Sequence, residues 1–186
     1  MKVFLTGHKG YIGNTLSKML LQENFDVVGC DLEYYPQGFI ENDISDVKSI
    51  KKDIRNLTSE DLKGCSAVLH LAALSNDPLG EINPTLTNEI NFLATIRLAN
   101  IAKEAGVSRF IYSSSCSTYG ANADTVDERS SLDPLTAYAK SKVDSEKAIL
   151  KISKYGVGRF SPSMTIECIS EEDAATSLCH ELPKNA

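Results

Sequence analysis

The chain has 186 residues, of which 42% are hydrophobic and 24% are charged, and its formal net charge is -6. This length suits one domain with a sizeable buried core, and the composition is unlike that of a disordered chain. The acidic balance, without any basic block, argues against nucleic acid as a partner, and no apolar run is long enough to cross a membrane.

Five cysteines are scattered along the chain, without a CxxC pair and without histidines at metal-ligand spacing. We therefore expect neither a zinc site nor a disulfide framework. The first residues enter a strand-like segment directly, without the features of a secretory signal peptide. Together these observations predict a reducing, cytoplasmic location and no membrane attachment.

Short apolar runs of strand length alternate with longer segments of helical periodicity. The predicted strands are, in chain order, "KVFLT" (residues 2–6), "FDVVGC" (25–30), "VKSIKKD" (47–53), "SAVLHLAA" (66–73) and "RFIYSSS" (109–115). A helix follows the first strand, and two long helices are predicted over residues 84–105 and 136–155. Asn83 before Pro84, and Gly106 after the first long helix, are typical boundary residues. The alternation predicts an α/β fold, a doubly wound parallel sheet with helices on both faces.

The stretch "FLTGHKGYIG" places Gly7, Gly10 and Gly13 between the first strand and the first helix. In that context the first glycine permits a tight turn, the second lets backbone approach a pyrophosphate, and the third lets the helix pack closely on the strand. The helix N-terminus adds N–H groups and a positive dipole end. A turn without a ligand is the alternative, which this strand–loop–helix context disfavours.

Asp31 follows the second strand, where an acidic residue accepts hydrogen bonds from the adenosine ribose of a dinucleotide. Its carboxylate would repel a 2'-phosphate, so the sequence favours NAD over NADP. Lys9 in the glycine loop could favour NADP instead. We interpret it as a solvated loop lysine, which is the commoner situation.

In the segment "YAKSK", Tyr138 and Lys142 are four residues apart and share one helix face. An ammonium group and an oxidised nicotinamide both favour a phenolate, and lowering a tyrosine pKa from near 10 by about three units takes about 4 kcal/mol. Tyr138 is therefore a candidate base, with a solvated surface pair as the alternative. Ser113, Ser114 and Ser115 end the neighbouring strand and would face the same site, unless they only begin a loop.

Four segments in this order resemble the extended short-chain dehydrogenase/reductase family: "TGHKGYIG", "DIRNLTSEDLKGCSAVLHLAAL", "SSSCSTYG" and "YAKSK". Within that family they are most similar to the NAD-dependent epimerase/dehydratase branch, which includes UDP-glucose 4-epimerase-like enzymes. The resemblance covers about residues 1–155. It implies a Rossmann-type NAD-binding domain over residues 1–160, and a short tail over residues 161–186 that is a remnant of the C-terminal substrate-binding part.

The resemblance implies three catalytic roles: Tyr138 as base, Lys142 as holder of the nicotinamide ribose, and Ser115 as the hydroxyl that orients the substrate. It also places Asp53 and Ile54 beside the adenine. The predicted cofactor-binding residues are Gly7, Gly10, Tyr11, Ile12, Gly13, Asp31, Asp53, Ile54, Leu71, Ala72, Ala73, Asn88, Ser113, Tyr138 and Lys142. Of these, Leu71, Ala72 and Ala73 would pass the pyrophosphate side, and Asn88 would lie on a central helix near the cofactor. We interpret His70, in the strand just before them, as a packed strand residue.

The chemistry implied by the resemblance is hydride transfer from a sugar carbon to NAD while the tyrosine takes the hydroxyl proton. Return of the hydride or elimination then follows, and nucleotide sugars are the usual substrates. Residues 73–80 are a candidate sugar contact, or a loop that only joins a strand to a helix. The resemblance also implies a homodimer through the two long helices, over residues 84–105 and 136–155.

Full members of the family continue beyond a sixth strand into a smaller substrate-binding domain, which we expect to be largely absent here. "GVGRFSPSMTI" (residues 156–166) can supply the sixth strand, and "ECISEEDAATSL" (167–178) resembles a stretch that relatives carry after the sugar-binding insert. We therefore hypothesise an internal deletion or a truncated gene. Three functions stay open: an active oxidoreductase or epimerase, an NAD-binding module or redox sensor without a substrate, and an inactive fragment.

Overall fold

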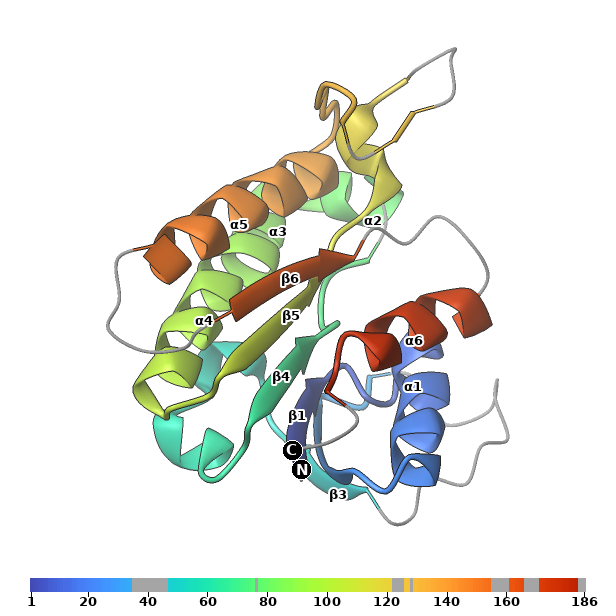
Figure 1. The fold of residues 1–186 in the computed structure, drawn as a ribbon. Coiled ribbons are helices and arrows are strands. Elements are labelled where there is room, and N and C mark those ends of the chain that lie inside the picture. Colours follow the sequence, from blue (N-terminus) through green and yellow to red (C-terminus); the bar gives the residue numbers. More distant parts are fainter. Residues whose placement is uncertain are drawn as a thin grey trace.

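The computed structural model describes residues 1–34, 47–75, 77–121, 126–127, 129–154, 161–165 and 171–183. Six strands form one sheet in the order β3-β2-β1-β4-β5-β6, and every neighbouring pair is parallel (Figure 1). They are β1 (Lys2–Thr6), β2 (Asp26–Asp31), β3 (Lys48–Lys51), β4 (Ala67–His70), β5 (Arg109–Ser113) and β6 (Ser161–Thr165). All six predicted strands are confirmed. The strand order reverses between β1 and β4, which is where parallel α/β sheets bind their ligands.

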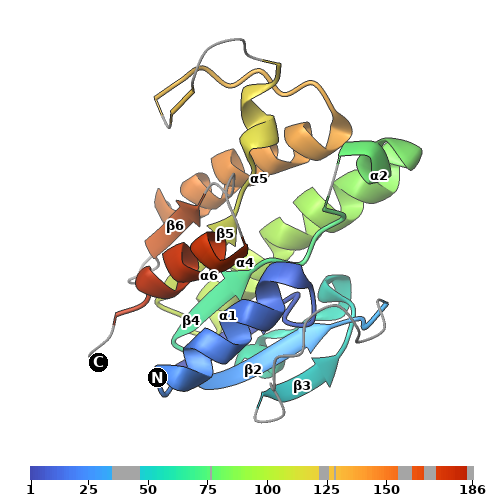
Figure 2. The same ribbon diagram turned by 90° about the vertical axis from the view of Figure 1, so that its right-hand side faces the viewer.

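Helices cover both faces of the sheet (Figures 1 and 2). Helices α1 (Tyr11–Gln22) and α6 (Glu171–His180) lie side by side on one face, and α4 (Ala94–Glu104) and α5 (Ala137–Lys154) lie on the other. The doubly wound architecture is therefore confirmed. Within the described ranges, no helix has the length and apolar character needed to cross a membrane.

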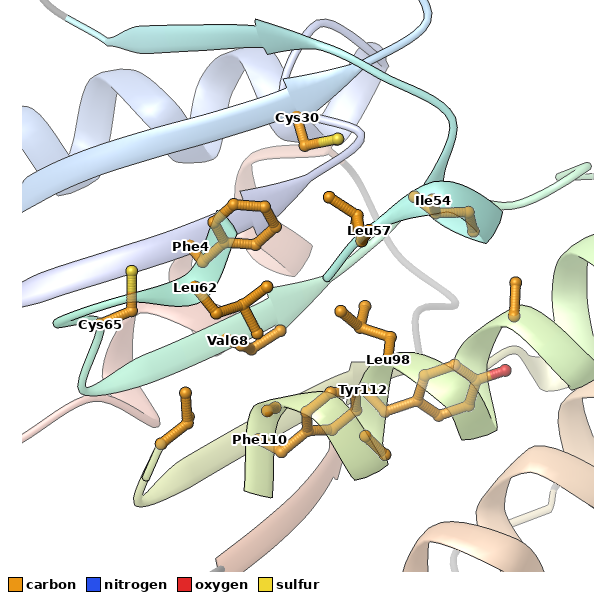
Figure 3. Close-up of a cluster of buried hydrophobic side chains, with 14 of the residues drawn as sticks. Phe4, Cys30, Ile54, Leu57, Leu62, Cys65, Val68, Leu98, Phe110 and Tyr112 are labelled. Carbon is orange, nitrogen blue, oxygen red and sulfur yellow. The ribbon is translucent and has the colours of Figure 1, made fainter. Parts of the chain in front are cut away.

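Strands β1, β4 and β5 are almost entirely buried, because helices cover both faces of the sheet, as is usual for parallel sheets. Phe4 of β1 packs with Val68, Phe110 and Leu98 of α4 in the core on one face (Figure 3). Its neighbour Leu5 points to the opposite face and packs in the cluster that α1 and α6 cover. Successive residues of one strand thus hold the two helical layers on either side.

Helix α6 is an integral part of this core, although the sequence analysis predicted no helix there. Ala175 and Leu178 are at most 1% exposed, and they belong to the same cluster as Leu16 and Leu20 of α1. The side chain of Arg109 in β5 also donates a hydrogen bond to the carbonyl of Glu181, just after the helix, at 2.5 Å. The end of the described chain is therefore packed on the sheet.

The helix predicted over residues 84–105 is present but not regular. It consists of α3 (Pro84–Thr87), the π-helical segment η3 (Asn88–Leu93) and α4. Inside η3 the carbonyl of Asn91 accepts hydrogen bonds from the hydroxyls of Thr95 (2.7 Å) and Ser145 (3.0 Å), which suits a locally widened helix. Asn83 caps α3 as predicted, because its side chain accepts a bond from the N–H of Leu86 at 3.0 Å.

Two other predicted segments can be compared with the observed elements. The second long helix spans Ala137–Lys154, and residue 155, its predicted end, lies outside the described residues. The predicted loop over residues 73–80 is helical at its end, because helix α2 spans Asp77–Ile82.

We expect Leu178→Ala to lower the free energy of unfolding by about 2 to 5 kcal/mol, because it opens a cavity in a buried cluster. Leu132→Ala, before α5 and outside both long helices, is the matched control, since Leu132 is 41% exposed and its loss should change stability by only about 0.5 kcal/mol. Urea denaturation of both variants measures the difference. Equal effects would mean that α6 is not part of the cooperative fold.

Candidate functional site

The glycine loop is so tight at Gly7 and Gly13 that a side chain would not fit at either position. Gly7 has a φ of 74°, and its N–H donates to the carbonyl of Cys30 at 2.8 Å. A Cβ on Gly13 would lie 2.0 Å from the carbonyl oxygen of Gly7, and a Cβ on Gly7 would lie 2.9 Å from the backbone nitrogen of Ala72. The loop is therefore pressed against both its own helix and the segment that follows β4.

The N-terminus of α1 faces this loop without a side-chain cap. Gly10 is the N-cap residue, and it has no side chain that could accept from the first N–H groups of the helix. Tyr11 is 66% exposed at the first helical position, and Ile12 follows it half-buried. The first N–H groups of α1 have no side-chain cap, and the glycines of the loop have no Cβ that would keep a ligand away from the backbone. Both features suit a pyrophosphate group.

Asp31 lies at the end of β2, next to the loop. Its Oδ2 accepts from the backbone N–H of Lys9 at 3.1 Å, and its Oδ1 accepts from the backbone N–H of Glu33 at 2.8 Å. The Nζ of Lys9 lies 2.5 Å from Oε1 of Glu33, and the Lys9 side chain is only 21% exposed. The interpretation of Lys9 as a solvated loop lysine is therefore wrong.

Asp53 and Ile54 follow the end of β3, beside Asp31. Asp53 begins the short 3-10 turn η1 (Ile54–Asn56), and its carboxylate pairs with the guanidinium of Arg55, with Nη2 and Oδ2 2.7 Å apart. That hydrogen-bonded pair holds the pKa of Asp53 below its ordinary value, so the carboxylate is charged near neutrality. Ile54 is buried in the core. The two predicted adenine-flanking residues thus lie at the same sheet edge as Asp31.

His70 at the end of β4 is a buried, neutral connector. The hydroxyl of Thr95 donates to a backbone carbonyl, so His70 Nε2 donates to Thr95 at 2.8 Å, and Nδ1 accepts from Thr6 at 2.7 Å. Burial, and then the nearby Lys142, lower its pKa to about 3. Thr6 also accepts from the N–H of Ala72 at 3.2 Å. The interpretation of His70 as a packed strand residue is confirmed.

Asn91 holds the segment after β4 in place, and the sequence analysis missed it. Its Oδ1 accepts from the N–H of Leu74 at 2.8 Å, and its Nδ2 donates to the carbonyl of Leu74 at 3.1 Å. The predicted cofactor residue Asn88 is instead exposed, whereas Asn91 is 1% exposed. The helical spacing of Asn91, Thr95 and Leu98 could have identified it, because this spacing puts Asn91 on the buried face of the helix, where a polar side chain needs hydrogen-bond partners.

Tyr138 and Lys142 lie buried on one face of α5, at 8% and 4% exposure. The Lys142 Nζ donates to the carbonyl of Ser113 at 2.7 Å and lies 5.5 Å from the centroid of the Tyr138 ring. It also lies 4.9 Å from the ring of Tyr112. The pair is therefore not a solvated helix surface. Helix α5 packs so that the ammonium group sits between the end of β5 and the phenol.

The three serines at the end of β5 and directly after it have separate contacts. The carbonyl of Ser113 binds Lys142, the hydroxyl of Ser114 donates to the carboxylate of Glu146, and Ser115 caps the 3-10 turn η4 (Cys116–Tyr119). In that cap the Ser115 Oγ accepts from the N–H of Ser117 at 3.2 Å. All three serines are buried.

Asp77 joins the segments that carry Ser115 and Tyr138. Its Oδ2 accepts from the hydroxyl of Ser117 at 2.9 Å, and its Oδ1 accepts from the hydroxyl of Thr136. The hydroxyl oxygen of Thr136 in turn accepts from the backbone N–H of Ala139, near the start of α5. The sequence analysis did not single out Asp77, because nothing in its spacing from Ser115 and Tyr138 shows that one carboxylate bridges both.

No cluster of three or more potential metal ligands occurs within the described ranges. The cysteines there, Cys30, Cys65, Cys116 and Cys179, are all free. The residues brought together at the sheet edge are suited to bind a dinucleotide and to move a proton.

Comparison with known proteins agrees with this chemistry. Residues 3–177 match the model of the NAD dependent epimerase/dehydratase family. The putative UDP-glucose 4-epimerase of Methanocaldococcus jannaschii is 28% identical over 161 residues, which cover 83% of this chain and 52% of that protein. The UDP-glucose 4-epimerase of Mycolicibacterium smegmatis is 33% identical over 156 residues, covering 78% of this chain and 49% of that protein.

A solved structure, described as MoeE5 in complex with UDP-glucose and NAD, matches with a TM-score of 0.79 and 30% identity. The match covers 88% of this chain and 53% of the MoeE5 chain. This chain thus spans about half the length of the relatives it matches.

We expect the stability of the protein to fall as the pH decreases from about 6.5 toward 3, partly because of His70. Its folded-state pKa of about 3 lies below the ordinary 6.5, so in this window the unfolded chain binds a proton that the folded chain does not. His70→Gln should flatten the pH dependence of the unfolding free energy by about 1 kcal/mol per pH unit below pH 6.

Denaturant unfolding of wild type and variant at a series of pH values measures this slope. His180→Gln is the matched control, because His180 is exposed at the end of α6. An unchanged slope in His70→Gln would show that His70 is not the buried neutral group described above.

Proposed function

The chain belongs to the NAD-dependent epimerase/dehydratase family, and on that premise we propose that it binds NAD and oxidises a nucleotide sugar at the carboxyl edge of its sheet. The observation that carries this proposal is the position of the Lys142 ammonium group, between the carbonyl of Ser113 and the ring of Tyr138. It supplies positive charge where a tyrosine base needs it, at the same sheet edge as the glycine loop.

In this proposal each part of the cofactor is assigned to its own residues. Asp31 lies where it can accept from the adenosine ribose, with Asp53 and Ile54 beside the adenine. The uncapped N-terminus of α1 and the loop from Gly7 to Gly13 suit the pyrophosphate, and Leu71, Ala72 and Ala73 form its other side. Lys142, Tyr138 and the end of β5, which contact one another, would hold the nicotinamide end. The role of Asn88 stays a prediction, while Asn91 shapes the segment after β4.

The chain's own residues would manage the proton. When bound, NAD accepts a hydride from the sugar and can return it. Tyr138 takes the proton of the reacting hydroxyl, and Lys142 stabilises the negative charge that this transfer requires on the phenol. Ser115 accepts a bond from the N–H of Ser117, so its own hydroxyl hydrogen is directed elsewhere and can hold the substrate oxygen.

The substrate class rests on the relatives. The Mycolicibacterium smegmatis relative is a UDP-glucose 4-epimerase, and the MoeE5 structure contains UDP-glucose and NAD. UDP-glucose is therefore the first probe of turnover. Because the chain matches only about half of these proteins, cofactor binding and sugar turnover are tested separately.

We expect calorimetry to show NAD binding to both the wild type and Tyr138→Phe, with affinities within about twofold, since the phenyl ring keeps the packing. In the presence of UDP-glucose, reduction of bound NAD should fall by about a hundredfold or more in the variant, because the base is gone. The absorbance of the reduced cofactor measures it.

Equal reduction rates in the two proteins would contradict the role of Tyr138. Binding of NAD without any reduction in the wild type would support an NAD-binding module instead of an enzyme. Absence of NAD binding to a folded sample would contradict the cofactor site itself.

We also propose a homodimer through the two long helical regions, because each carries an exposed leucine: Leu93 is 51% and Leu150 is 41% exposed. The expected solution mass is twice that of the chain at micromolar concentration, measured by light scattering. Combined Leu93→Arg and Leu150→Arg changes should give a monomer, whereas Leu135→Arg, at a 58% exposed position outside these helices, should not. A monomeric wild type would contradict the proposal.

A further inference from the structure

Four charged side chains surround the adenosine end of the site, and we call them the ribose-end cluster: Lys9, Asp31, Glu33 and Lys51. Glu33 connects them, because its Oε1 lies 2.5 Å from Lys9 Nζ and its Oε2 lies 3.4 Å from Lys51 Nζ. Two ammonium groups and two carboxylates leave the cluster with no net charge.

Lys9 starts from the phosphate loop itself. Its backbone N–H donates to Oδ2 of Asp31 at 3.1 Å, so its side chain leaves the loop next to the carboxylate proposed to hold the ribose hydroxyls. An ammonium group in this position would attract a 2'-phosphate, which carries close to two negative charges near neutrality. In this structure the ammonium group is directed to Glu33 instead.

The backbone of Glu33 is held in an unusual conformation that keeps this contact. Its φ is 58°, in the left-handed region that residues with a Cβ rarely adopt. The N–H of Glu33 donates to Oδ1 of Asp31 at 2.8 Å, which fixes the turn after β2. The hydrogen bond from Lys9 holds the pKa of Glu33 below its ordinary value, so the carboxylate is charged near neutrality. Strain of this kind is typical of positions that serve a binding site.

We propose that Glu33 determines cofactor choice together with Asp31, by engaging Lys9 and Lys51 so that neither ammonium group is available to a 2'-phosphate. This inference rests on the proposed binding of NAD. It means that the chain contains the cationic groups of an NADP site and that one carboxylate neutralises them. Asp31 repels the phosphate directly, whereas Glu33 acts through the two lysines.

The test is the affinity of NAD and NADP, measured by calorimetry for wild type and Glu33→Gln. The amide keeps the size of the side chain but removes its charge, so NADP affinity should rise by about tenfold while NAD affinity changes by less than about threefold. Because the effect is electrostatic and partly exposed to solvent, the gain should shrink at high salt. Circular dichroism confirms that each variant is folded.

Two further variants isolate the cause. Glu60→Gln makes the same charge change at a pair with Lys63 that is 79% and 78% exposed and outside the cluster, and it should leave both affinities unchanged. In Glu33→Gln combined with Lys9→Gln, most of the NADP gain should disappear, because the freed ammonium group is gone.

The outcomes separate this inference from the proposed function. If the wild type binds NAD and Glu33→Gln binds NADP no better, the inference is overturned and the NAD site stands. If Glu33→Gln weakens both cofactors equally, Glu33 only supports the turn after β2, and the inference is again overturned. If the folded wild type does not bind NAD, the proposed function fails first.

Discussion

The close approach of Gly13 to the carbonyl of Gly7 is the constraint on which the site depends. A Cβ on Gly13 would lie 2.0 Å from that oxygen, so the start of α1 can pack on the loop only because glycine is there. This approach brings the helix N-terminus to the ends of β1 and β2 and sets Lys9 against Asp31. The loop proposed to bind the pyrophosphate and the contact between Lys9 and Asp31 thus both depend on one close approach in the backbone.

Hydrogen bonds between uncharged side chains connect β1 to β4 and to α4. Thr6 at the end of β1 contacts His70, and His70 contacts Thr95 in α4, so three elements meet in a chain of buried side chains. A charged His70 would be costly because the side chain is buried and lies near the Lys142 ammonium group, and its lowered pKa keeps it neutral. Of the His70 and Lys142 side chains, only Lys142 therefore carries a positive charge near neutrality, and it lies beside the Tyr138 ring.

The sequence was sufficient for the features that local spacing encodes. Three glycines after a short strand, and Tyr138 four residues before Lys142, fix which elements carry the site, and alternating apolar runs predict the sheet. Spacing carries no information about contacts between distant segments. The pairing of Lys9 with Glu33, and the clamp of Asn91 on Leu74, depend on how segments fold together, so they were found only in the structure.

The contacts that support the proposed NAD site differ from those that a sugar substrate would need. The groups proposed to hold NAD are fixed by contacts among described residues, from the loop at Gly7 to the bond between Lys142 and Ser113. The sheet that carries them is covered on both faces, since α6 packs beside α1. Near the start of α5, by contrast, Ile82 at the end of α2 is 79% exposed and Leu135 just before α5 is 58% exposed. Apolar groups exposed beside the helix of Tyr138 do not by themselves orient a sugar. The proposed binding of NAD therefore depends on packing that is present among the described residues, whereas the proposed turnover depends on contacts that a substrate must form at this edge.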